Sequence, residues 1–226
     1  MRQTTTKGAD TRLRMIQVAA DLLHRKGIHA TSPDEIIEAS RTGKGQFYHY
    51  FGSKQGLVRE VLKTHLDAIT TGTSPINYDI QSWSDLEKWF RAHLEMQKRF
   101  SMTRGCPFGT IGNGLSDDDD PVRQDLVLLF EVVKNKLTAF FIREKATGRL
   151  VAQAQEQELA DFCLATVQGA MLMGKIRHSA ETVESTVSQA LTYLKQLAVE
   201  PAVDPAAAGR AASKARSKPP RRRSGH

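Results

Sequence analysis

The stretch Ala39–Leu57, ASRTGKGQFYHYFGSKQGL, decides the fold of this chain. It carries five consecutive aromatic residues, from Phe47 to Phe51, between two glycines. A helix turns by about 100° per residue, so two turns cannot bury five rings on one face. The i,i+4 spacing of Phe47 and Phe51 predicts that these two rings pack inward. The side chains left to project outward are Lys44, Gln46, Tyr48, His49 and Tyr50.

The residues before this stretch predict a second short helix over 33–39. Ser32 is a candidate N-cap, Pro33 suits the first helical position, and Glu35 completes a capping box. A polar turn over 40–43 then leads into the aromatic helix over 44–51, with Gly43 as its cap.

Upstream, an apolar stripe at steps of three and four predicts a first helix over 11–26, with Asp10 as N-cap and Gly27 closing it in the left-handed region. Three short helices, the last two joined by a four-residue turn, outline a helix-turn-helix. An N-terminal helix dipole and a nearby cation, Lys54, would favour phosphate. The alternative is a structural aromatic patch with solvated lysines.

Helical periodicity continues through the rest of the chain, and no useful stretch alternates with period two. We therefore predict an all-α protein, a three-helix head followed by a larger helical body. The expected body helices cover residues 54–71, 84–102, 120–146, 153–177 and 180–198, and Ser53 is a candidate N-cap of the first.

The charge is unevenly distributed along the 226 residues. The net charge is +4 over residues 1–60, −3 over 61–200 and +6 over 201–226, which sum to +7. A basic head and tail around a mildly acidic middle favour a polyanionic partner at one end. Residues 201–226 contain no large apolar side chain, so we expect a disordered tail that adds salt-sensitive, nonspecific DNA affinity.

Several classes of protein are disfavoured. No uninterrupted apolar run reaches the roughly 20 residues that span a bilayer, and the polar start is unlike a secretory signal. Two cysteines suit a reducing cytoplasm and exclude a disulfide framework or zinc finger. The histidines lack metal-ligand spacing. We therefore expect a cytoplasmic protein with no membrane contact, metal site or cofactor.

Ala39–Leu57 closely resembles the helix-turn-helix signature of the TetR family of bacterial transcriptional regulators, and the preceding helix, with Ala19-Ala20 and Leu22-Leu23, is similar too. The resemblance implies a homodimer of all-α subunits that reads a palindromic operator in double-stranded DNA and responds to an effector. The regions expected are a flexible N-terminus 1–10, a DNA-binding domain 11–55, a ligand-binding and dimerisation domain 56–200, and a tail 201–226.

Carried over position by position, the resemblance assigns seven residues to DNA. Gln46 and His49 would face base edges, and Gly45 would let the backbone come close. Ser32, Tyr48 and Lys54 would contact phosphates, and Lys44 would contact a base or a phosphate. Arg41 departs from the family pattern, because it replaces the usual glycine of the turn.

The body resembles the electrophile-responsive NemR-type branch around Arg104-Gly105-Cys106-Pro107 and Gln168–Leu172, with Lys175 as the cysteine's partner. A cysteine near an arginine and at a helix start would have a lowered pKa and a reactive thiolate. The alternative is a small buried thiol that only packs. Trp89 and Trp83 could line a pocket for a planar ligand or belong to the core. The candidate sensing residues are Arg104, Cys106, Lys175 and Trp89.

For dimerisation, the sequence suggests an apolar surface made by Gly169, Ala170 and Gly174 on one late helix and a Val183–Leu197 stripe on the next.

We therefore expect a transcriptional regulator, a repressor released by a small molecule or by thiol modification at Cys106. Two alternatives remain. A nonspecific architectural DNA-binding protein would bind all sequences equally. An enzyme with Cys106 as nucleophile is disfavoured, because no histidine is placed as its base and no catalytic constellation is present.

Overall fold

The computed structural model describes residues 6–116 and 118–199. The predicted tail 201–226 and the first five residues of the predicted flexible N-terminus lie outside this range. Within it, the elements are helices, joined late in the chain by one isolated β-bridge between Leu150 and Ala198. The helices are α1 (Thr6–Lys26), α2 (Pro33–Ala39), α3 (Lys44–Phe51), α4 (Lys54–Thr71), α5 (Trp83–Arg99), α6 (Pro107–Gly112), α7 (Asp120–Ala146), α8 (Glu156–Arg177) and α9 (Ala180–Leu197). The predicted all-α fold is confirmed.

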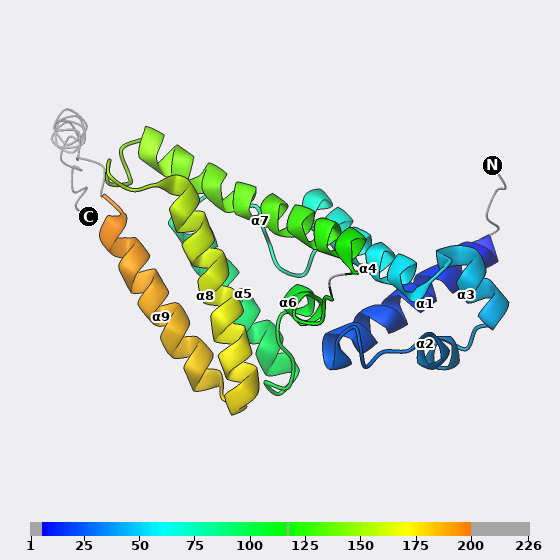
Figure 1. Cartoon of the computed structure of the whole chain (residues 1–226). Helices are drawn as coiled ribbons and strands as arrows, with labels where there is room; N and C mark the ends of the chain where they lie inside the picture. The colour runs from blue at the N-terminus through cyan, green and yellow to red at the C-terminus, as the bar shows by residue number, and fades with distance from the viewer. Residues whose placement is uncertain (1–5, 117, 200–226) are drawn as a thin grey trace, which may run out of the picture.

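The molecule is elongated, with the head α1–α3 at one end and the pair α8–α9 at the other (Figure 1). The long helix α7 packs on α4 towards the head and on α8 towards the far end, and α5 packs on α8 and α9. The short helix α6 lies where the two ends meet and contacts both α1 and α7.

Side-chain caps hold the starts of three of the described helices, α2, α4 and α5. Ser32 accepts the Glu35 backbone N–H at 3.2 Å and Ser53 accepts the Gly56 N–H at 3.0 Å, as the sequence predicts. Gly27 closes α1 with φ +79°. The predicted start of the first helix is wrong. It begins at Thr6, so Asp10 lies inside α1 and is not its N-cap.

The predicted capping box at Ser32 is formed on one side only. Glu35 reaches away from the cap, and its carboxylate accepts from Lys26 at the end of α1 at 2.5 Å. The pair ties the first two helices of the head together at the surface.

Arg41 adopts the left-handed region with φ +52°, as a residue in a glycine's place must. Its N–H donates to Glu38 and the next N–H, of Thr42, donates to Ile37, both at 3.0 Å. This pair of bonds is a Schellman motif that ends α2. The turn of the helix-turn-helix therefore carries backbone strain that a glycine would avoid.

The predicted dimerisation surface is wrong for most of its residues, although Gly169 is exposed. Ala170 and Gly174 are buried, and a side chain on Gly174 would overlap Val183 of α9 in the same chain. The apolar stripe of α9 is buried as well. These residues join α8 to α9 within one subunit. The large apolar side chains of this pair that are exposed are Leu172, Met173, Ile176 and Tyr193.

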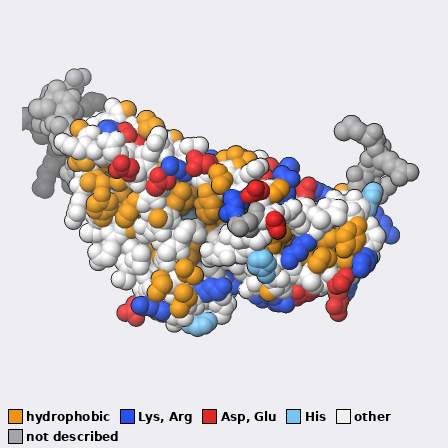
Figure 2. Space-filling model, viewed as in Figure 1, with side chains coloured by type: hydrophobic (Ala, Val, Ile, Leu, Met, Phe, Trp, Pro, Cys, Tyr) orange, Lys and Arg blue, Asp and Glu red, His pale blue; other side chains and the backbone are white. Residues whose placement is uncertain are grey.

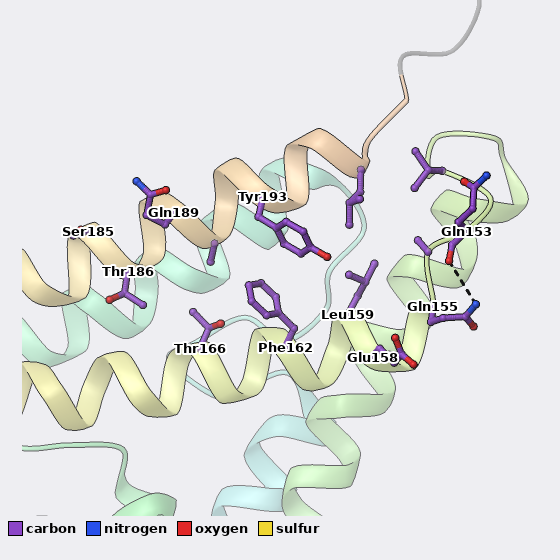
Figure 3. A pocket seen from close by; sticks show the side chains of 14 residues that line it. Gln153, Gln155, Glu158, Leu159, Phe162, Thr166, Ser185, Thr186, Gln189 and Tyr193 are labelled. Atoms are coloured by element: carbon purple, nitrogen blue, oxygen red, sulfur yellow. Dashed lines mark hydrogen bonds between the residues drawn. The ribbon is translucent and has the colours of Figure 1, made fainter.

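One of these exposed residues, Tyr193, lines a groove of about 900 Å³ between α8 and α9 (Figure 3). The rings of Phe162 and Tyr193 meet edge-on across it, with centroids 5.2 Å apart, and Thr166 and Thr186 lie further along. An 18-residue window of α8 reaches a mean hydropathy of 1.2 with 39% of it buried, enough by length and composition to cross a membrane. Since α8 packs on α5, α7 and α9, we attribute this apolarity to packing on two faces.

Candidate DNA-binding surface and effector site

The aromatic helix α3 is anchored by two buried rings and presents its other side to solvent. Phe47 is fully buried and Phe51 is 8% exposed, with ring centroids 5.6 Å apart. Tyr50 differs from the prediction, because it is half-buried against the core. Five of the predicted DNA-contacting residues form an exposed row along α3: Lys44, Gly45, Gln46, Tyr48 and His49. Figure 2 shows Lys and Arg side chains around apolar ones at this end of the molecule.

Two of the predicted DNA contacts also cap helices. Ser32 is exposed and holds the start of α2. Gln46 accepts the Gly43 N–H through Oε1 at 3.0 Å, which leaves its NH₂ group facing outward. A donor in this position suits an acceptor on a base edge, such as N7 of a purine.

The basic side chains at this surface are held loosely. Lys44 lies 3.9 Å from Asp34, and both side chains are largely exposed, so the pair leaves the ammonium available. Lys54 begins α4 and is half-buried beside the same surface. Gly45 faces open space, since a Cβ built there meets no atom within 4 Å.

The four predicted sensing residues are brought together only in part. Cys106 and Trp89 line a cavity of about 100 Å³ between α5, α7 and α8. Cys106 also borders a second hollow of about 480 Å³, which Lys175 and Gln168 line. Arg104 lies elsewhere. It pairs with Asp21 of α1 at 2.7 Å and covers the ring of Phe100, 4.2 Å from its centroid.

The predicted lowering of the Cys106 pKa is wrong. The thiol is 8% exposed, and burial raises its pKa, while the N–H of Gly109 and the Gln168 amide lower it less strongly. The guanidinium expected to stabilise a thiolate is engaged by Asp21. Cys163 is buried in the core, and burial raises its pKa as well.

The segment that contains Cys106 is fastened directly to the head. His24 of α1 lies 2.8 Å, Nε2 to O, from the carbonyl of Gly105. Because a carbonyl only accepts, Nε2 carries the proton. Burial is the main cause that lowers the His24 pKa, so the ring is neutral at pH 7. The Arg104–Asp21 pair makes a second link between the same two segments.

Sequence reasoning missed His93 and Tyr78, which line the cavity of Cys106, and His24, which contacts the neighbouring Gly105. Each is a single polar residue on an apolar helix or loop, and such a residue carries no spacing signal. The contact of His24 with Gly105 joins positions 81 residues apart in the chain, which a local pattern cannot predict.

A head of three short helices, with a polar row on the third, and a helical body with an internal cavity define a helix-turn-helix regulator. Residues 15–61 match the profile of the bacterial regulatory proteins of the tetR family, and residues 83–190 match the tetracyclin repressor-like C-terminal domain. This chain belongs to the TetR family of transcriptional regulators, which bind DNA.

Individual relatives are distant but cover most of the chain. The transcriptional repressor DhaR of Mycobacterium sp. strain GP1 is 25% identical over 175 residues, 76% of this chain and 86% of its own. The repressor NemR of Escherichia coli K12 is 24% identical over 200 residues, 85% and 96%. The crystal structure of reduced NemR from E. coli superposes with a TM-score of 0.69 at 22% identity, covering 86% of this chain and all of that one.

Proposed function

We propose that this protein is a cytoplasmic, homodimeric repressor that binds a palindromic operator and is released by an effector in its body. The observation that carries the proposal is the exposed row on α3, held outward by the buried Phe47 and Phe51. Gln46 and His49 read bases, Lys44 reaches a base or a phosphate, and Ser32, Tyr48 and Lys54 hold phosphates. Named repressors among the relatives support the direction of control.

A second subunit places two such rows on one duplex. The exposed apolar residues of α8 and α9, among them Tyr193 in the groove of Figure 3, supply a self-complementary face. A two-fold dimer reads a palindrome because its symmetry matches that of the site, with half-sites separated by about one helical turn or a multiple of it.

Release follows from the position of the cavity. An effector beside Cys106 displaces the segment 104–112, and this segment is bonded to α1 through His24. The heads then take a spacing that the operator disfavours. An effector can weaken operator binding only by its own preference for that spacing, typically 5- to 150-fold.

A noncovalent small molecule is the first candidate effector, since burial keeps the Cys106 thiol protonated at pH 7. Thiol modification is the second, because the same sulfur borders two hollows and shares one of them with Lys175. The proposed role is one of binding and sensing, with no catalytic step.

The experiment is a titration of selected operator duplex by the full chain, with and without diamide or N-ethylmaleimide, repeated with Cys106→Ser. Release in the wild type alone supports thiol sensing. Operator that stays bound in both proteins rejects thiol sensing and leaves the noncovalent effector. Release in both proteins means that the reagent acts at another residue.

A further inference from the structure

The cavity of about 100 Å³ lies inside the body, where α5, α7 and α8 meet the loop after α4. Its walls are mainly apolar side chains and aromatic rings. Its polar side chains include two histidines, His65 and His93, together with Ser74, Tyr78, Trp89, Cys106 and Gln168.

Trp89 supplies a hydrogen-bond donor with no partner. Its side chain is 2% exposed, and no acceptor for Nε1 is present among the described residues. A buried N–H without an acceptor is unfavourable, because it has lost its water and gained nothing in return. Trp89 is one of the residues that line the cavity, so it brings an unused donor to this part of the core.

His93 supplies an acceptor beside it. Its Nδ1 lies 2.8 Å from the carbonyl oxygen of Trp89, so Nδ1 carries the proton and donates. Burial lowers the pKa of His93 to about 4, so the ring is neutral at pH 7 and Nε2 has a free lone pair. The rings of Trp89 and His93 meet edge-on, with centroids 4.7 Å apart, and both residues line the cavity.

The cavity wall carries no fixed charge. Among the residues that line it, none is Lys, Arg, Asp or Glu. Arg104 and Lys175 line neighbouring hollows instead. An anion placed here would lose its hydration without gaining a counter-charge.

We propose that this cavity takes a small uncharged ligand whose carbonyl or hydroxyl oxygen accepts the Trp89 N–H, with the rest of the molecule apolar. A hydroxyl satisfies the His93 acceptor as well. Cavities of about 150 Å³ hold benzene, so the ligand has about six non-hydrogen atoms or fewer. This inference rests on the proposed function, because it names the chemistry of the effector that the body would take.

The test observes the indole directly. The chain has two tryptophans, so ¹⁵N-tryptophan labelling of the full protein gives two indole N–H signals, assigned with Trp83→Phe. The probes are cyclopentanone, with an acceptor, and methylenecyclopentane, of the same shape without one. Butanamide and butyrate form a second pair, alike in shape and different in charge.

We expect cyclopentanone to move the Trp89 indole N–H signal downfield until the shift saturates. Methylenecyclopentane, which has no acceptor, should cause no such downfield shift. Butanamide should bind at least tenfold more tightly than butyrate. Trp89→Phe should weaken cyclopentanone binding about tenfold, whereas Trp83→Phe should not. If Trp89→Phe fails to fold, the wild-type shifts alone decide.

The proposal would be overturned if neither cyclopentanone nor butanamide shifted the Trp89 signal. It would also be overturned if butyrate bound as tightly as butanamide. The outcome is separable from the proposed function, because operator selection is carried out without ligand. If the protein selects a palindrome but the Trp89 indole signal does not move, only the proposed ligand class is rejected. If the indole signal moves but no palindrome is selected, only the proposed operator binding is rejected.

Discussion

Gly45 is the residue at which folding and DNA binding make opposite demands. It lies in the first turn of α3, and a methyl group there would meet no protein atom within 4 Å. Gly45→Ala should therefore raise the free energy of unfolding by about 0.5–1 kcal/mol, since alanine favours the helix. The same methyl would stand between α3 and the duplex, so operator affinity should fall about tenfold or more.

Urea unfolding and anisotropy titration of the operator measure the two effects. A more stable variant with unchanged operator affinity would show that α3 does not approach DNA closely at Gly45.

Buried histidines make the stability of the fold depend on pH. Burial lowers the pKa values of His24 and His65, and lowers that of His93 to about 4. The unfolded chain therefore binds more protons between pH 6.5 and 4. The contribution of these histidines to the free energy of unfolding is complete above pH 6.5. It decreases as the pH falls towards 4, and His93 alone accounts for a loss of about 3 kcal/mol.

Urea unfolding at pH 7 and pH 4.5 checks this dependence. His93→Gln should flatten the dependence, and the exposed His29→Gln should leave it unchanged. A wild-type protein equally stable at both pH values would contradict the burial of these rings.

At the same scale, the sequence predicts the caps but not the chemistry of Cys106. Ser32, Ser53 and Gly27 act through neighbours within four residues, which a local pattern records. The Cys106 pKa depends on burial by helices far away in the chain, and Arg104 points to Asp21, 83 residues distant. The predicted thiolate failed for that reason.

At the scale of elements, the contact between α1 and the segment before α6 connects the effector cavity to the DNA-binding head. His24→Phe keeps the edge-on packing on Phe100, now at 5.3 Å between centroids, and removes the bond to Gly105. We expect operator binding to persist and the fold-change on adding the releasing effector to shrink towards one. The measurement is operator affinity with and without that effector.

Asp21→Asn is the matched control, because it removes the partly exposed link from Arg104. Such surface pairs contribute little, so release should stay close to wild type. Full release in His24→Phe would mean that coupling does not pass through this bond.

The helices themselves are largely predictable from apolar periodicity, and the majority of their ends are predicted to within about three residues. The extension of α1 back to Thr6 was missed because residues 6–10 carry no apolar stripe. The dimer face was misplaced for a different reason. A stripe such as Val183–Leu194 shows that a helix face is buried, but not whether the partner helix belongs to the same chain.

At the scale of the whole molecule, dimerisation should depend on the outer face of α8. Ile176 is 63% exposed there, beside Met173. Ile176→Glu should shift sedimentation velocity from dimer to monomer, because a carboxylate would be buried at the interface. Affinity for the palindrome should fall 100-fold or more as the second head is lost.

Ile142→Glu is the matched control, since Ile142 is 53% exposed on α7. It should remain dimeric. Monomers in both variants, or in neither, would reject α8 as the dimer face.

The most direct test of the central claim is selection of duplexes from a randomised library by the full-length protein, in parallel with a Gln46→Ala, His49→Ala variant. If α3 reads the sequence, the wild type should enrich one palindrome, and the variant should enrich none or a different one. Equal recovery of all sequences, or the same palindrome from both proteins, would contradict sequence reading by α3.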